Sequence, residues 1–129
     1  MPYIYADVDN LQNTDKVGSK HCVALIQHYT DAPNTRDWSE GQVVMGSSGL
    51  AKGTAIATFV AGRYPNHSSG NHAAFLLSVE SNGIWVMDQW KDDASKPKVS
   101  KRFLRKKGKD KNGKFIDPSN NADAYSVIN

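Results

Sequence analysis

The spacing of apolar residues changes once along the chain, from a helical period to the shorter period of strands. Before the change, apolar residues recur at intervals of three and four, at Cys22, Leu25, Ile26 and Tyr29. Ser19 precedes them as a suitable N-cap residue, and the turn-forming sequence Asp31-Ala32-Pro33-Asn34 follows them. The pattern therefore predicts one helix over residues 19–29.

Beyond residue 53 the pattern is typical of strands. Five short apolar or alternating stretches are bounded by turn residues, and they predict strands over residues 54–60, 73–79, 84–89, 99–104 and 124–128. Residues 38–53 contain several glycines and show a mixed pattern. A helix followed by consecutive strands with short connections predicts an α+β fold with an antiparallel sheet. Residues 106–113 are expected to form an exposed loop or hairpin tip.

The length and charge of the chain limit its class. With 129 residues and no repeat or low-complexity linker, residues 1–129 are expected to form a single domain. No apolar run approaches the roughly 20 residues needed to cross a bilayer, and no signal peptide is visible at the N-terminus. The net charge is only +3, but basic residues gather between Lys101 and Lys114. This stretch predicts either a surface for a polyanion such as nucleic acid or a solvated loop.

The single cysteine, Cys22, is the candidate nucleophile. One cysteine can form neither an internal disulfide nor a multi-thiolate zinc site, and no His-x-x-x-His or Cys-x-x-Cys spacing indicates a metal site. In the first turn of a helix, unsatisfied backbone N–H groups lower the pKa of a thiol and favour its reactive thiolate. The alternative interpretation is a buried free cysteine that acts as a small hydrophobic residue.

His72, at the start of a predicted strand, is the candidate base for Cys22, and Asp88 or Gln89 on the next strand is the candidate residue that orients it. Side chains alternate between the faces of a strand, so the loop between the two strands decides which of them faces His72. A two-residue Asn82-Gly83 turn would select Gln89. An odd loop such as Ser81-Asn82-Gly83 would select Asp88, and the reach between the strands favours this second arrangement. The set Cys22, His72 and Asp88 predicts a cysteine-nucleophile hydrolase.

The other histidines fit this role less well. His21 is adjacent to Cys22, and neighbouring helical side chains diverge by about 100°. His28 lies round the helix from Cys22, and His67 lies in a polar loop. Trp90, Gln89 and Asn71 flank the predicted catalytic residues and are the candidate substrate-binding residues, with Trp90 as a wall of the groove. The backbone N–H of Cys22 is the candidate oxyanion donor.

Five short segments occur in an order that supports a family resemblance: Lys20-His21-Cys22-Val23, Trp38-x-x-Gly41, Gly53-Thr54-Ala55-Ile56-Ala57, Gly70-Asn71-His72-Ala73 and Val86-Met87-Asp88-Gln89-Trp90. They resemble segments of the NlpC/CHAP superfamily of papain-like cell-wall hydrolases. The resemblance implies a papain-like fold in which an N-terminal helix bearing the nucleophile packs on an antiparallel sheet, and it implies no cofactor. Cys22 would attack an amide carbonyl of a peptidoglycan peptide, His72 would act as base and acid, and Asp88 would orient His72.

Two positions depart from the family pattern. CHAP domains often carry Glu followed by Asn where this chain has Asp88-Gln89, and His21 stands where many relatives have glutamine. The chain also looks similar to type VI secretion amidase effectors, most of all to the third, Tae3-like family. That likeness implies synthesis in a bacterial cytoplasm, secretion, action in the periplasm of a target cell, and as partners the secretion machinery and a cognate immunity protein.

Two other functions remain open on the sequence alone. One is a non-enzymatic polyanion-binding module that uses the basic 101–114 stretch, although aromatic residues are not interleaved with it as in a base-stacking surface. The other is a cysteine hydrolase of other amides, which would use the same three residues.

Overall fold

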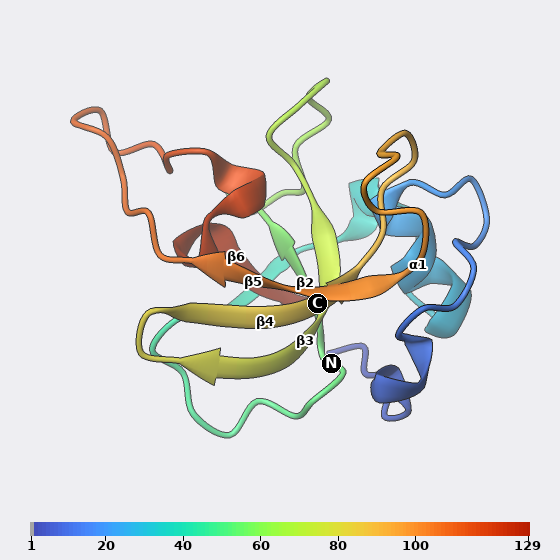
Figure 1. Cartoon of the computed structure of the whole chain (residues 1–129). Helices are drawn as coiled ribbons and strands as arrows, with labels where there is room; N and C mark the ends of the chain where they lie inside the picture. Colours follow the sequence, from blue (N-terminus) through green and yellow to red (C-terminus); the bar gives the residue numbers. More distant parts are fainter. Residues whose placement is uncertain (1) are drawn as a thin grey trace.

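An antiparallel sheet of six strands is the frame of the structure (Figure 1). The computed structural model describes residues 2–129. The strands are β1 (Glu40–Val43), β2 (Ala55–Thr58), β3 (Ala73–Glu80), β4 (Gly83–Asp88), β5 (Ser100–Arg105) and β6 (Tyr125–Ile128), in the spatial order β1-β6-β2-β3-β4-β5. Within these residues there are also one α-helix, α1 (Cys22–Tyr29), and four short 3₁₀ helices: η1 (Val8–Leu11), η2 (Thr35–Asp37), η3 (Pro118–Asn120) and η4 (Ala122–Ala124).

The predicted α+β class with an antiparallel sheet is confirmed, and each of the five predicted strands is present within a few residues of its expected bounds. Strand β1 was not predicted. It pairs only with β6 at the edge of the sheet, and none of its four residues is buried, so it lacks the apolar alternation that identifies a half-buried strand.

Helix α1 is shorter than predicted because the backbone before it is not helical. Gly18 and Lys20 have positive φ angles of 58° and 72°, which a right-handed helix does not accommodate. The N-cap position is His21, without a side-chain cap, and Ser19 is not the N-cap. The helix therefore begins at Cys22 itself, which places the thiol in the first helical position.

Apolar side chains form a core on each face of the sheet, because alternate residues of a strand point to opposite sides. On β2, Ala55 and Ala57 belong to the core that includes Leu25 and Ile26 of α1, whereas Ile56 belongs to the other core. Figure 1 shows α1 on one side of the sheet and the orange-to-red segment of residues 106–124 on the other. None of the helices within residues 2–129 has the length and apolar character needed to cross a bilayer.

The hairpin of β3 and β4 has a two-residue connection, Ser81-Asn82, since Glu80 pairs with Gly83. This even loop alone would have placed Gln89 on the side of His72. The register shifts between Leu76 and Ser78, however, and one extra residue in a strand exchanges its two faces.

Beyond this bulge Phe75 pairs with Met87, so the same register carries Asp88, and not Gln89, to the face of His72. Asp88 therefore lies on the face of His72, as expected. A β-bulge produces this arrangement, and the expected three-residue loop is absent.

Two glycines with positive φ allow a test of the close contact between the segment around Tyr5 and the backbone at Gly53. Gly53 (φ 92°) hydrogen-bonds through its carbonyl to Tyr5 N, and a Cβ at Gly53 would lie 2.1 Å from Tyr5 O. Gly46 (φ 80°) has open space around the corresponding position. We expect Gly46→Ala to lower the free energy of unfolding by about 1–2 kcal/mol, from backbone strain alone, and Gly53→Ala to lower it by roughly 3 kcal/mol or more. Urea unfolding measures both, and equal losses would contradict the close approach at Gly53.

Candidate active site

Cys22 is half-buried at the first position of α1, and Gln89 fixes the segment that leads into it. The Gln89 side chain is fully buried. Its Oε1 accepts a hydrogen bond from Val17 N at 3.0 Å, and its Nε2 donates to Val17 O at 3.1 Å and His21 O at 2.9 Å. The expected substrate contact of Gln89 is therefore at odds with its position, because all of these polar atoms are engaged by the backbone and away from solvent.

His72 lies immediately before β3, with its main chain bonded to β2. His72 N donates to Thr58 Oγ1 at 3.1 Å, and Thr58 N donates to His72 O at 3.0 Å. The ring is buried, and its Nε2 lies 2.8 Å from Oδ2 of Asp88, which is itself fully buried. Because Asp88 engages Nε2, Nδ1 is the ring nitrogen left for Cys22.

The three groups shift one another's proton affinities. Burial raises the pKa of Cys22, but the hydrogen bond and charge of His72, with smaller contributions from the Ala73 N–H and Tyr64, bring it below its usual value. Burial lowers the pKa of His72, but hydrogen bonds and charges of Asp88 and Cys22 raise it to about 9. The arrangement thus favours a thiolate beside an imidazolium.

Tyr64 is the neighbour of Cys22 that the sequence analysis missed. Its hydroxyl lies 3.8 Å from Cys22 Sγ and accepts a hydrogen bond from Asn71 Nδ2 at 3.4 Å. Burial, together with the charge of Cys22, raises the pKa of Tyr64 well above its usual value, so the hydroxyl keeps its proton. Asn71 Oδ1 is buried without a donor among residues 2–129. Tyr64 lies in a loop without periodicity, where no sequence pattern points to an inward side chain.

Two cations contact Asp88 in addition to His72. Arg102 Nε donates to Asp88 Oδ2 at 2.7 Å, and Lys96 Nζ lies 3.0 Å from Asp88 Oδ1. Burial raises the pKa of Asp88, but His72, Arg102 and Lys96 together hold it well below its usual range. Arg102 was counted in the basic stretch, yet it shares a face of β5 with buried Leu104, so strand alternation is the signal that could have identified it.

Trp90 packs over the His72–Asp88 pair. Its ring is half-buried and edge-on to the His72 ring, with 5.9 Å between centroids. Lys96 Nζ lies 5.1 Å and the Arg102 guanidinium carbon 4.7 Å from the Trp90 ring centre. Trp90 therefore shields the charged cluster, while its partial exposure leaves it available at the surface.

The remaining histidines lie apart from this cluster. His21, His28 and His67 are exposed, and within residues 2–129 their side chains form no hydrogen bond with Cys22 or Asp88. Among residues 2–129 there is no group of three or more carboxylate, imidazole and thiol side chains suited to a metal ion.

One residue of the basic stretch points inward. Arg102 points to Asp88, Lys107 pairs with Asp117 at 2.7 Å, and Lys109 lies over the Phe115 ring. Apart from Arg102, the basic residues of the 101–114 stretch are exposed.

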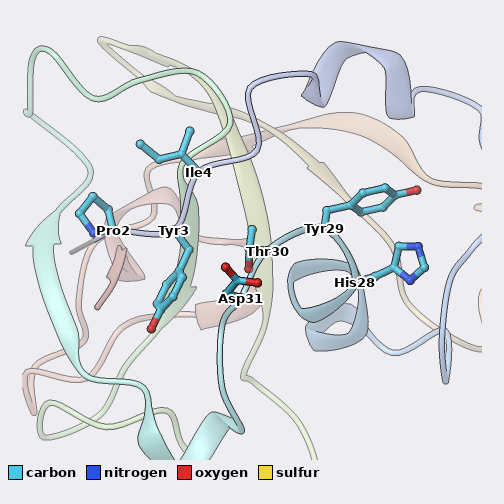
Figure 2. A pocket seen from close by; sticks show the side chains of 7 residues that line it. All are labelled: Pro2, Tyr3, Ile4, His28, Tyr29, Thr30 and Asp31. Carbon is cyan, nitrogen blue, oxygen red and sulfur yellow. The ribbon is translucent and has the colours of Figure 1, made fainter.

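A cavity of about 510 Å³ adjoins the segment that carries His72. Thr58, whose hydroxyl binds His72 N, and Gly70 line it together with apolar side chains including Phe59, Pro65 and Phe115. A second cavity, of about 440 Å³, lies at the other end of α1. Figure 2 shows Pro2, Tyr3 and Ile4 on one side of this cavity and Thr30 and Asp31 facing them, whereas Cys22 begins the helix at its opposite end.

Comparison with known proteins identifies relatives over nearly the whole chain. Residues 6–128 match the family described as domesticated amidase effector 2 (Dae2). The chain is 54% identical over 132 aligned positions to a type VI secretion amidase effector 2 protein of Salmonella typhi, with 99% of each chain covered. It is 37% identical over 118 positions to a domesticated amidase effector 2 of Ixodes scapularis, covering 87% of this chain and 72% of the relative.

A solved structure leads to the same family. The chain is similar to a type 6 secretion amidase effector 2 (Tae2), with a TM-score of 0.92 and 52% identity over 98% of this chain and 93% of that chain. The sequence resemblance had named the third family of amidase effectors, whereas each of these relatives carries the name of the second. The chain therefore belongs to the domesticated amidase effector 2 family.

Proposed function

We propose that this protein is a type VI secretion effector that hydrolyses amide bonds in the peptide part of peptidoglycan, with Cys22, His72 and Asp88 as its catalytic residues. The names of the relatives support an amidase effector. The observation that carries the mechanism is the Asp88–His72 hydrogen bond of 2.8 Å beside a thiol at a helix start. The order of nucleophile on a helix, imidazole at one strand and carboxylate on the next supports a papain-like site of the NlpC/CHAP kind.

In the first half of the reaction, the Cys22 thiolate attacks the amide carbonyl carbon. A bond forms between Sγ and that carbon, and the C–N bond then breaks as His72 gives its Nδ1 proton to the leaving amine. The product is an acyl-enzyme on Cys22. Asp88 keeps the ring oriented through Nε2 throughout this step.

In the second half, a water molecule attacks the thioester carbon while His72 takes a proton from it. The C–S bond breaks, the peptide leaves with a new carboxylate, and the thiolate–imidazolium pair is restored. His72 thus acts first as acid and then as base.

Two donors are suitably located for the oxyanion that forms in both steps. One is the backbone N–H of Cys22, which has no partner within the helix because it is in the first turn. The other is the Tyr64 hydroxyl, 3.8 Å from Sγ and kept protonated by its surroundings. Asn71 supports that hydroxyl with a hydrogen bond, so its proposed contribution to substrate binding is indirect.

The cavity lined by Thr58 and Gly70 is a suitable place for part of the peptide substrate, because it adjoins the segment that carries His72. Trp90 does not line this cavity, but its half-exposed ring beside the His72 ring is a suitable second contact for the substrate. The partners that follow from this function are peptidoglycan, the secretion machinery and an immunity protein that protects the producing cell. A cysteine hydrolase of other amides would use the same residues, and substrate profiling separates it from the peptidoglycan enzyme.

The proposed function predicts the effect of two substitutions on isolated sacculi. Cys22→Ala removes the nucleophile and His72→Ala the acid and base, so each is expected to reduce the release of cleaved muropeptides to the level without enzyme, a loss of at least about 10³-fold. His28→Ala, at an exposed position outside the cavity proposed for the peptide, is the matched control and should retain full activity. Unchanged muropeptide profiles with the folded wild-type protein would overturn the proposal.

The charges of the site predict how the reactivity of Cys22 depends on pH. His72 is the main group that lowers the pKa of Cys22, and burial raises it. In His72→Ala the effect of burial therefore dominates, the pKa of Cys22 rises, and less of the thiol is ionised at pH 7. We expect the rate of alkylation by iodoacetamide at pH 7 to fall about tenfold or more in this variant. Cys22 is the only cysteine, so alkylation of the whole protein reports this thiol alone. Equal rates in His72→Ala and the control His28→Ala would contradict the ion pair.

The same charges predict the alkaline limit of hydrolysis. His72 has a pKa raised to about 9, so it holds the proton needed by the leaving amine below this pH and loses it as the pH rises through this value. The rate kcat/KM on soluble muropeptides should therefore fall above about pH 9. A fall near pH 6.5, the usual range of histidine, would contradict the effect of Asp88.

A further inference from the structure

Lys96 and Arg102 contact the carboxylate that orients His72, although neither takes part in the proposed reaction. We propose that they are positioning residues, whose charges hold Asp88 in place as an ionised acceptor and weaken its hold on the His72 imidazolium. His72 is thereby able to release its proton to the leaving amine. This inference rests on the proposed function for its catalytic consequence, but its effect on His72 is measurable without substrate.

Arg102 is fixed by contacts at each end of its guanidinium. Its Nε donates to Asp88 Oδ2, the same oxygen that faces His72 Nε2. Its Nη1 donates to Asn120 Oδ1 at 2.8 Å and its Nη2 to Ser119 O at 3.4 Å. The segment around η3 therefore holds the guanidinium against Asp88, and its position does not depend on the carboxylate alone.

Lys96 acts on the other oxygen through charge. Its ammonium is buried and donates to the carbonyl and the hydroxyl of Ser100. It lies 3.0 Å from Asp88 Oδ1 without hydrogen-bond alignment, and no other donor among residues 2–129 reaches that oxygen. Because Asp88 has no contact with solvent, the charge of Lys96 is what stabilises the negative charge on Oδ1.

The consequence for His72 follows from the sign of these charges. A buried carboxylate beside a histidine stabilises the imidazolium and makes it a weaker acid. A cation on the far side of the carboxylate opposes this, because it repels the imidazolium and is attracted to the same oxygens. With two such cations, Asp88 orients the His72 ring but raises the proton affinity of that ring less than it would without them.

Within residues 2–129, no other charged group takes over this role. The groups that face the pair from other elements are Cys22 on α1, Tyr64 in the loop before β3 and Tyr125 on β6. The thiolate of Cys22 favours the imidazolium, and burial keeps the hydroxyls of Tyr64 and Tyr125 protonated. Lys16 lies near but donates to Trp90 O at 2.6 Å. Among the described residues, Lys96 and Arg102 are therefore the cations that oppose the effect of Asp88 on His72.

The Trp90 ring strengthens this effect by covering both cations. Lys96 and Arg102 each lie within about 5 Å of its ring centre, in the range of a cation–π contact. The ring keeps water away from the cluster, and charges that are shielded from water act on one another more strongly.

The test is to titrate His72 in variants that remove or keep each charge. In Lys96→Met and Arg102→Gln we expect the pKa of His72, followed by ¹⁵N NMR of its imidazole, to rise by about one unit. The alkaline limit of kcat/KM on muropeptides should rise with it, kcat should fall about tenfold, and KM should stay unchanged. Lys96→Arg and Arg102→Lys keep the charge and should restore most of each effect.

Lys98→Met is the matched control, since Lys98 lies two residues from Lys96 but pairs with the exposed Asp15. It should change neither the pKa of His72 nor kcat. If Lys96→Met does not fold, Arg102→Gln carries the same test, because Arg102 is partly exposed and its polar partners accept an amide.

The outcomes separate this inference from the proposed function. Loss of activity with an unchanged pKa of His72 and an unchanged pH profile would mean a merely structural role and would overturn the inference. If the pKa of His72 rises in the variants but the wild-type protein leaves sacculi intact, the charge effect is supported and peptidoglycan is rejected as the substrate.

Discussion

The site depends on one buried carboxylate. Asp88 has no contact with solvent, yet it is ionised because three positively charged or proton-bearing groups surround it: the His72 ring, the Arg102 guanidinium and the Lys96 ammonium. A buried charge without such partners would be strongly destabilising. Asp88 lies on β4, and its partners come from β5, the residue before β3 and the connection before β5. The positions of these elements and the charge of Asp88 are therefore mutually dependent.

Most of the fold could be predicted from the sequence, because alternation and helical spacing report burial directly. The five strands with buried residues and the helix with Leu25 and Ile26 were identified in this way. The edge strand β1 was not, since its residues stay in contact with solvent and carry no such signal. The start of α1 was misplaced because Lys20 has a positive φ, in a turn whose backbone Gln89 binds on either side; residue spacing does not report such a tertiary contact.

The candidate site was predictable only in part. Cys22, His72 and Asp88 could be proposed because their residue types and order carry chemical meaning. The bulge at Leu77 could not be, as it depends on how β3 and β4 pack in three dimensions, and yet it decides which of Asp88 and Gln89 faces His72. Tyr64 and Lys96 lie in irregular segments, where residue type and spacing do not reveal whether a side chain points inward.

Strand alternation also explains why three consecutive residues serve different parts of the site. Asp88 and Trp90 point to the side of His72, where one binds its ring nitrogen and the other covers the pair. Gln89, between them, points to the opposite side and holds the backbone that leads into Cys22. The end of β4 therefore fixes both the imidazole and the entrance to α1. Since the hydrogen bonds of this one short segment hold both the His72 ring and the backbone before Cys22, they fix how the two side chains are placed relative to each other.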